Sequence, residues 1–219
     1  QRRQLQGYFT EMLAHELKTS LSVFNFVLGS PQPSEEMVAH ARSTAQGLDE
    51  LINRCLITQQ FDDNQILLEV AYFRVDQLID ELIQKVPYAA RCSAYYEERI
   101  SIKSDRQLLQ LALSNLLDNA AKYSEPDTPI QIRLKIVSSQ GLRGCEISIE
   151  NDVRLLAGAP VFPDKDRLFD KYYRADSAHR YTGAGLGLYL VEQSAKTLGG
   201  RVQYEASASR VKFSLWIPC

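Results

Sequence analysis

Apolar residues at helical spacing dominate the first 60 residues and constrain the fold of this chain more than any other feature. One set recurs every three or four residues, as one face of an α-helix requires, and consists of Leu13, Leu17, Leu21, Phe24 and Leu28. A second set has the same spacing and consists of Met37, Ala41, Ala45, Leu48, Ile52 and Cys55. The segment 29–34, Gly-Ser-Pro-Gln-Pro-Ser, separates the two sets, and Ser34 is a suitable cap for the second helix. The pattern predicts a helical hairpin.

The predicted hairpin is too small to bury both of its apolar stripes. Pairing two copies of the chain would cover them, because four amphipathic helices can enclose a common core. We therefore expect a homodimer that is built on a four-helix bundle. The polar segment 61–65, Phe-Asp-Asp-Asn-Gln, follows the second helix and is the expected domain boundary, so residues 1–62 are assigned to a dimerisation domain.

Residues 66–219 alternate between strand-like and helix-like segments. The strand-like segments are 67–75, 100–102, 130–137, 145–149 and two closing strands, of which the last ends at 213–217. The helix-like segments are 75–86, 105–123 and one that ends at Leu198 after a long irregular segment, 153–182. Strands with helices on one side indicate an α/β sandwich. The expected fold class is therefore α+β, with a helical hairpin followed by an α/β sandwich domain.

Composition argues against several classes of protein. The formal net charge of −2 does not suggest a nucleic-acid-binding surface. No stretch approaches the 18 or so apolar residues that indicate a membrane-spanning helix, and no signal peptide is recognised. Cys55, Cys92, Cys145 and Cys219 are far apart, which predicts reduced thiols and not a zinc site or a disulfide framework. Because the chain starts at Gln1, inside a helical pattern, we expect it to be part of a longer protein.

His15 is the first candidate for chemistry. At about 100° per residue it lies opposite the leucine stripe of the first helix, so its imidazole is predicted to face solvent. Glu16 is its neighbour, and Thr19 lies one turn further along on the same face. A neutral, exposed imidazole can attack phosphorus while an adjacent carboxylate orients it. A lone exposed histidine is nevertheless usually a plain surface residue.

The residues around His15 favour a phospho-acceptor over a plain surface residue. The run HELKTSL, which begins at His15, resembles the phospho-acceptor box of sensor histidine kinases, H-E-L-[RK]-[TN]-P-L. The resemblance implies that His15 accepts a phosphoryl group, and that Thr19 with Glu16 positions a water for the reverse reaction, dephosphorylation of the partner. The family usually has proline at the position of Ser20. Since proline bends a helix, Ser20 is expected to leave this helix straighter.

Asn115, Asn119 and Lys122 are three and four residues apart and share one face of a predicted helix. Amide oxygens suit Mg²⁺ and a lysine can neutralise phosphate charge, although such amides can also simply cap or solvate a helix. The run NLLDNAAKY, from Asn115 to Tyr123, resembles the N box of the histidine kinase ATP-binding domain. The resemblance implies that Asn119 holds Mg²⁺ and that Asn115 and Lys122 line the phosphates of ATP. Tyr123 is included in the same nucleotide site.

Two later motifs extend the resemblance. The run LFDKYYR, which ends at Arg174, resembles the F box that anchors the lid over ATP, and implies that Arg174 reaches the γ-phosphate. The run GAGLGL resembles the second glycine box, and implies that the phosphates lie against Gly183, Gly185, Leu186 and Gly187. Glycines let the backbone approach phosphate oxygens, and the helix that follows offers free N–H groups. A glycine turn alone is a weak signal, but the three boxes in this order form a strong one.

The first glycine box, D-x-G-x-G in the family, is altered in this chain. Asn151 stands at the position of the aspartate that accepts the adenine amino proton, and Val153 stands at the first glycine. Asp152 is one residue out of phase, so in a strand it would point to the opposite face. We therefore expect Asn151 to contact adenine through an uncharged oxygen and ATP binding to be weak.

The resemblance covers nearly the whole chain and implies an enzyme that uses ATP and Mg²⁺. It implies autophosphorylation of His15 in residues 1–62 by a catalytic domain in 66–219, followed by transfer to an aspartate of a response regulator. The chain would be the cytoplasmic part of a protein of the bacterial inner membrane. One alternative is a kinase-weak signalling module, which would act as a phosphatase or dock partners. Another is an ATPase of the gyrase or heat-shock type, against which the HELKTSL hairpin argues.

Overall fold

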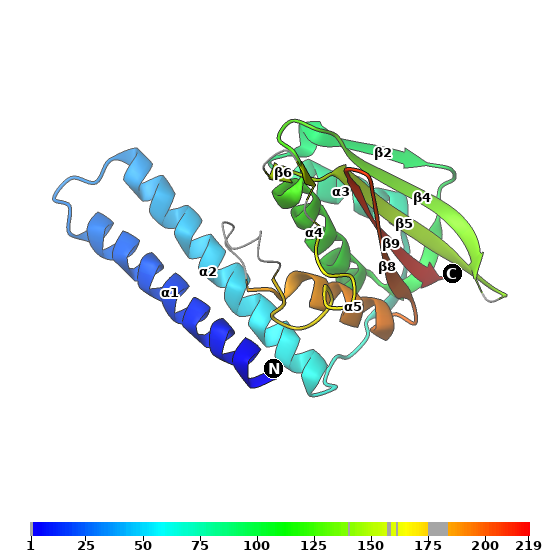
Figure 1. Cartoon of the computed structure of the whole chain (residues 1–219), viewed down its shortest axis with the longest axis horizontal. Coiled ribbons are helices and arrows are strands. Elements are labelled where there is room, and N and C mark those ends of the chain that lie inside the picture. Colours follow the sequence, from blue (N-terminus) through cyan, green and yellow to red (C-terminus); the bar gives the residue numbers. More distant parts are fainter. Residues whose placement is uncertain (1, 140, 157–158, 161, 175–183) are drawn as a thin grey trace. The chain divides into compact units, whose positions relative to one another are not determined.

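The computed structural model describes residues 2–139, 141–156, 159–160, 162–174 and 184–219 (Figure 1). The chain forms two compact units. The first contains the N-terminal helices up to Ile66, together with Lys171–Tyr173 and the glycine-box residues up to Leu186. The second contains most of the remaining residues. None of the described helices combines the length and apolarity that crossing a membrane requires.

The first unit is built on a helical hairpin, as predicted. Its helices are α1, Arg2–Leu28, and α2, Glu35–Asp62. Ser34 caps α2, because its side chain accepts a hydrogen bond of 3.2 Å from the backbone N–H of Met37. Helix α1 continues without interruption through Ser20, as expected for a position that lacks proline.

The second unit contains a five-stranded sheet with the order β2-β4-β5-β9-β8. Its strands are β2 (Cys92–Tyr96), β4 (Ile130–Ser139), β5 (Leu142–Asp152), β8 (Arg201–Ser207) and β9 (Arg210–Pro218). Strand β2 pairs with β4 in parallel, and the other neighbours are antiparallel. Two short pairs lie outside this sheet, namely β1 (Val70–Arg74) with β3 (Ser101–Asp105), and β6 (Leu155–Leu156) with β7 (Ala159–Pro160).

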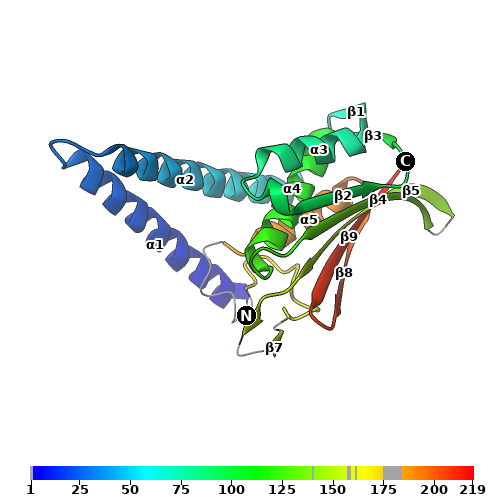
Figure 2. The ribbon, with the colours of Figure 1, turned by 90° about the horizontal axis from the view of Figure 1, so that it is seen from above.

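Three helices cover one face of the five-stranded sheet (Figure 2). They are α3, Val75–Lys85, α4, Arg106–Tyr123, and α5, Gly187–Thr197. The core lies between helices and sheet, because Ile147 and Ile149 of β5 are buried while the alternate residues Glu146 and Glu150 are partly exposed. The predicted α/β sandwich is confirmed.

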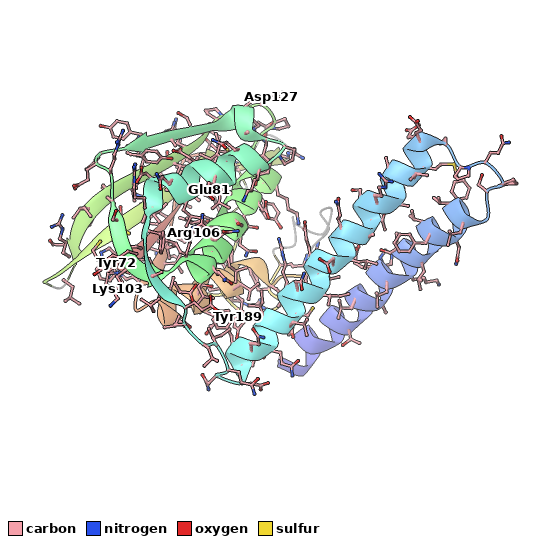
Figure 3. The ribbon with its side chains drawn as sticks, turned by 180° about the vertical axis from the view of Figure 1, so that it is seen from behind. Tyr72, Glu81, Lys103, Arg106, Asp127 and Tyr189 are labelled. Atoms are coloured by element: carbon pink, nitrogen blue, oxygen red, sulfur yellow. The ribbon has the colours of Figure 1, made fainter. Side chains whose placement is uncertain are left out.

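Surface contacts tie the outer elements of this unit together (Figure 3). Arg106 at the start of α4 forms an ion pair of 2.6 Å with Glu81 of α3. Lys103 of β3 lies over the ring of Tyr72 of β1, with its Nζ 5.9 Å from the ring centroid. Both contacts are exposed, so they contribute little to stability and mainly fix local register.

Strand β2 is the main element that the sequence did not predict. Its residues are exposed or half-buried because it lies at the edge of the sheet, so they lack the alternating apolar pattern of a covered strand. The preceding 3₁₀ turn, Ala89–Arg91, was not predicted either. The segment 153–182 was predicted to be irregular, and its described part contains the short pair β6–β7, an isolated β-bridge at Val153 and turns.

Candidate functional site

Helix α4 places three of the candidate residues on one face. It is capped by Asp105, whose Oδ1 accepts hydrogen bonds from the backbone N–H groups of Gln107 (2.9 Å) and Leu108 (3.0 Å). Such a cap fixes where the helix begins, and therefore which face carries the residues three and four positions apart. Asn115 on that face is only 3% exposed, whereas Asn119 is half-buried.

The side chain of Asn115 is incompletely bonded inside the protein. Its Nδ2 donates to the carbonyl oxygen of Leu111 at 2.8 Å, but its buried Oδ1 has no hydrogen-bond partner in the part of the chain that the structure describes. Buried polar atoms are almost always satisfied, so an orphan acceptor indicates a place for a ligand or water. This unpaired oxygen is the first structural indication of a binding site.

The N-terminus of α5 lies against the same amides. A Cβ atom on Gly187, the first residue of α5, would lie 3.1 Å from Oδ1 of Asn115 and 3.8 Å from Nδ2 of Asn119. The first N–H groups of a helix lack intrahelical partners and carry the positive end of its dipole. The N-terminus of a helix and an unpaired amide oxygen therefore lie together, an arrangement that suits a phosphate group with a metal ion.

Gly185 is held in a conformation that favours glycine. Its φ is +66°, and a Cβ there would lie 2.7 Å from the carbonyl carbon of Tyr172 and 2.8 Å from the carbonyl oxygen of Tyr173. The N–H of Tyr172 donates to the carbonyl oxygen of Gly185 at 2.9 Å. The F-box and glycine-box segments are thus in direct backbone contact within the first unit. Leu186, the next residue, is buried.

Asn151 faces the helices from the end of β5. It is 4% exposed, and its Nδ2 donates to the carbonyl oxygen of Asp152 at 3.1 Å. Asp152 points to the other face of the sheet, where its Oδ1 accepts a 3.2 Å hydrogen bond from Nε of Arg210. The strand phase inferred from the sequence is therefore confirmed. Asp152 is not available to replace the missing aspartate on the helix-facing side.

The altered glycine box continues as paired backbone. Val153, at the position of the first glycine, is buried and forms a β-bridge with Ser124, the residue after α4. Glu125 N–H donates to the carbonyl oxygen of Asp152 at 3.1 Å, and Arg154 N–H donates to that of Tyr123 at 3.0 Å. These bonds join the end of the N-box helix directly to the segment that follows Asn151.

Arg91 is a supporting residue that the sequence did not indicate. Its Nε donates to the carbonyl oxygen of Thr128 at 3.0 Å, and its Nη2 donates to that of Glu125 at 3.2 Å and to the hydroxyl of Ser124. It therefore fastens the turn after α4. In the sequence, Arg91 is one charged residue in a segment for which no element was predicted, and such residues are too common to single out a positioning role.

Tyr88 anchors the same 3₁₀ segment to α4 from its N-terminal side. Its hydroxyl donates to Oδ1 of Asp118 at 2.8 Å. Burial of the phenol, with the neighbouring Asp118 carboxylate, raises the pKa of Tyr88. Asp118 lies between the two asparagines of the N box in sequence, so this contact orients the helix that carries them.

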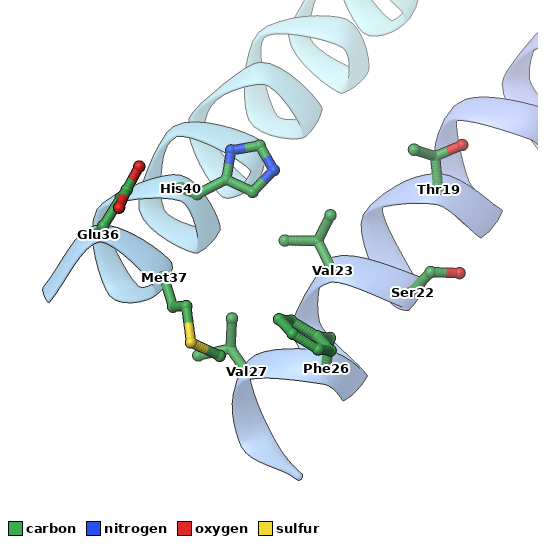
Figure 4. Close-up of a pocket in the computed structure, with 8 residues that line it drawn as sticks. All are labelled: Thr19, Ser22, Val23, Phe26, Val27, Glu36, Met37 and His40. Carbon is green, nitrogen blue, oxygen red and sulfur yellow. The ribbon is translucent and has the colours of Figure 1, made fainter. Parts of the chain in front are cut away.

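His15 lies on α1 in an exposed position, as predicted. Thr19, one turn further, is also exposed, and Glu16 is half-buried. Near Thr19, a groove of about 490 Å³ runs between α1 and α2 (Figure 4). Most of the surface that faces the groove is apolar. The lining residues are Thr19, Ser22, Val23, Phe26, Val27, Glu36, Met37 and His40. The groove continues the apolar stripes that α1 and α2 leave uncovered.

Lys122 and Tyr123 lie together at the C-terminal end of α4. Nζ of Lys122 lies 5.3 Å from the ring centroid of Tyr123, at the end of α4. Arg174 is half-buried at the end of the F-box segment, and Gly183 lies outside the described residues. The acceptor-box residues of α1 belong to the first unit, and the nucleotide-site candidates of α4 and β5 belong to the second. Among the described residues, no group of three or more His, Cys, Asp or Glu side chains is placed to hold a metal ion.

Comparison with known proteins identifies the second unit. The profile of the family described as "Histidine kinase-, DNA gyrase B-, and HSP90-like ATPase" matches residues 104–219, more than half of the chain. The chain belongs to this ATPase family. The match includes the N box, the F box and both glycine boxes. Asn115, whose Oδ1 lacks a hydrogen-bond partner among the described residues, therefore lies inside the ATPase family domain.

Relatives connect this ATPase family domain to the helical hairpin. The chain is 28% identical over 227 aligned positions to the heme sensor protein HssS of Staphylococcus aureus, covering 98% of this chain and 47% of that protein. The chain therefore spans about half the length of the curated relatives it matches. The resemblance to bacterial sensor histidine kinases, which the sequence motifs indicated, is confirmed.

Solved structures share the fold. The histidine kinase AdeS of Acinetobacter baumannii matches with a TM-score of 0.70 at 21% identity, over 93% of this chain and 97% of that chain. Full-length ShkA in complex with AMPPNP matches with a TM-score of 0.63 at 19% identity, over 99% of this chain and 45% of that chain. At these identities the likeness concerns the fold alone, and it covers the hairpin as well as the sandwich.

Proposed function

We propose that this chain is the phospho-acceptor and ATP-binding part of a sensor histidine kinase. Residues 1–62 would present His15, and residues 66–219 would bind ATP with Mg²⁺. His15 would accept the γ-phosphoryl group and pass it to an aspartate of a response regulator. Since the related sensors are about twice as long, the chain would be the cytoplasmic portion of a longer membrane-bound protein.

The observation that carries this proposal is the buried, unpaired Oδ1 of Asn115 beside the N-terminus of α5. Oxygen ligands and a helix N-terminus suit a nucleotide phosphate that carries Mg²⁺, so the residues present fit this group. Asn119 would hold the ion, while Asn115 and Lys122 would line the phosphates, with Tyr123 beside the nucleotide. Bound Mg²⁺ would neutralise charge on the phosphates. Gly183, Gly185, Leu186 and Gly187 would form the wall of the phosphate site.

The acceptor side depends on an accessible neutral imidazole. The exposed ring of His15 can approach the γ-phosphorus in line with the leaving oxygen of ADP, and one P–N bond then replaces one P–O bond. Glu16 would orient the ring, and Arg174 would stabilise charge on the moving phosphoryl group. Thr19 lies one helical turn from His15 on the same face, where it would hold a water for dephosphorylation of the response regulator.

Binding of ATP can be tested by thermal unfolding. With Mg²⁺ and ATP at about 100 times the dissociation constant, the folded state should gain about 2.7 kcal/mol, which corresponds to a rise of roughly 5–10 °C in Tm for a chain of this size. EDTA should remove most of the effect. If millimolar ATP with Mg²⁺ leaves Tm unchanged, the proposed nucleotide site is wrong.

The hairpin supports a homodimer. Its apolar side chains remain open to solvent in one copy, with Leu17 45%, Leu21 58% and Phe26 70% exposed. A second hairpin would cover this surface and the groove beside it, since four helices can enclose what two cannot. Light scattering at micromolar concentration should therefore give twice the mass of the chain. A monomer under these conditions would contradict the four-helix bundle.

The second candidate function is a kinase-weak signalling module that acts as a phosphatase or docks partners. The observation that favours it is the altered glycine box, in which buried Val153 is bridged to Ser124. Backbone that is fixed in this way leaves less room for nucleotide than a glycine turn does. Absence of a thermal shift with ATP would favour this module, because it needs no nucleotide, whereas a shift requires the labelling experiment to separate the two functions.

Asn151→Asp should tighten ATP binding several-fold if Asn151 contacts adenine. A charged acceptor contributes roughly 1 kcal/mol more than a neutral one, and 1.4 kcal/mol corresponds to a tenfold change in affinity. The same substitution removes the 3.1 Å bond from Nδ2 to Asp152, so the nucleotide-free variant should melt at a lower temperature. Calorimetric titration with ATP and Mg²⁺ measures the affinity. Weaker or unchanged binding would mean that Asn151 does not face adenine.

A further inference from the structure

Two cysteines that are far apart in sequence lie side by side at one end of the sheet. Cys145 of β5 is paired with Ile217 of β9, and the backbone N–H of Cys219 donates to the carbonyl oxygen of Arg143 at 3.1 Å. Alternate residues of a strand point to the same face, so Cys219 lies on the same face as Ile217. Cys145 and Cys219 are therefore diagonal neighbours across two antiparallel strands.

The two thiols interact but differ in accessibility. As diagonal neighbours in this register, the two side chains are close enough for each thiol to shift the pKa of the other. Cys145 is completely buried, whereas Cys219 is exposed, and both are free thiols. A dissolved oxidant can therefore reach Cys219 directly, while the second thiol lies on the neighbouring strand.

The environment divides the roles of the two sulfurs. Interaction with the neighbouring Cys145 thiol lowers the pKa of Cys219, and the positive charge of Arg143 acts in the same direction against partial burial. Interaction with the Cys219 thiol, together with burial, raises the pKa of Cys145. Cys219 is thus favoured as the thiolate, which is the reactive form of cysteine, and Cys145 keeps its proton.

We propose that Cys145 and Cys219 form a peroxide-sensitive pair that closes into a disulfide. The Cys219 thiolate attacks one oxygen of hydrogen peroxide, the O–O bond breaks, and hydroxide leaves and takes up a proton to become water. The sulfur of Cys145 then displaces the hydroxyl group of the Cys219 sulfenic acid as a second water. In sum, two thiols and one peroxide give one disulfide and two waters.

The bond would stabilise the sheet without reaching the nucleotide site. It would join the end of β9 to β5, and these strands already pair from Gly144 to Asp152. Cross-linking residues so distant in sequence restricts the unfolded chain strongly, so Tm should rise by roughly 5–10 °C. Asn151 lies at the opposite end of β5, and the affinity for ATP should change by less than about twofold.

The test treats the whole chain with hydrogen peroxide, alkylates the remaining thiols and maps peptides by mass spectrometry. The expected product has lost two hydrogens and contains one cross-linked peptide pair joining Cys145 and Cys219. Its raised Tm should return to the starting value with a phosphine reductant. Cys219→Ser changes an exposed residue, so it should fold normally and lose both the cross-link and the Tm shift.

Two further variants make the result specific. Cys55→Ser removes a thiol elsewhere and should keep the cross-link and the Tm shift. Cys145→Ser should leave Cys219 as a sulfenic acid that dimedone traps. Oxidation of Cys219 to sulfinic acid in the parent while Cys145 remains alkylable would overturn the proposal. So would a disulfide through Cys219 that joins two copies of the chain.

Discussion

His15→Gln should reduce incorporation of phosphate from γ-labelled ATP to background. The neutral imidazole is a nucleophile at phosphorus, whereas the amide of glutamine is not, although it is polar and similar in length. Because the side chain at position 15 is exposed on α1, the replacement should leave the fold and the affinity for ATP unchanged. The label in the parent should be acid-labile, as expected for a phosphorus–nitrogen bond.

His40→Gln is the matched control for this experiment. His40 is also exposed and also lies in the hairpin, on α2, but its neighbours in sequence are Ala39 and Ala41, and the acceptor box is absent there. This variant should be phosphorylated like the parent. If acid-labile phosphate persists in His15→Gln, the acceptor is another residue and the assignment of α1 is wrong. If neither parent nor variant is labelled while ATP still raises Tm, the kinase-weak alternative is favoured.

Gly185→Ala should weaken ATP binding by at least about tenfold, or about 1.4 kcal/mol. The new Cβ would lie 2.7 Å from the carbonyl carbon of Tyr172 and 2.8 Å from the carbonyl oxygen of Tyr173, and backbone atoms cannot move aside as a flexible side chain can. The F-box and glycine-box segments would have to separate. If this contact anchors the lid over ATP, the Gly185→Ala variant loses one wall of the phosphate site. Calorimetric titration with ATP and Mg²⁺ would measure the loss of affinity.

Gly141→Ala separates this steric effect from backbone strain. Gly141 has a φ of +79°, close to that of Gly185, but a Cβ there would meet nothing within 4 Å. Both variants bear the cost of a left-handed conformation, roughly 1–2 kcal/mol. Only Gly185→Ala adds the collision. Equal affinities for ATP in the two variants would show that the contact between the boxes does not support nucleotide binding.

Local sequence patterns were enough to predict most of the elements and the altered pocket. The spacing of Leu13, Leu17 and Leu21 predicted a helix, and Ser34 was correctly predicted to cap the next one. The alternation along β5 was enough to place Asn151 toward the helices and Asp152 away from them. These features follow from the periods of helix and strand, which depend on neighbours along the chain.

What the sequence by itself determined is therefore local: the two helices, the strand phases and the order of the boxes that indicate an ATPase domain. Only the tertiary structure decided which distant groups meet. The orphan oxygen of Asn115 faces Gly187, Arg91 fastens the turn after α4, and Cys219 lies beside Cys145. Each contact depends on strand order or helix packing, and no period in the sequence encodes these because they join segments through space.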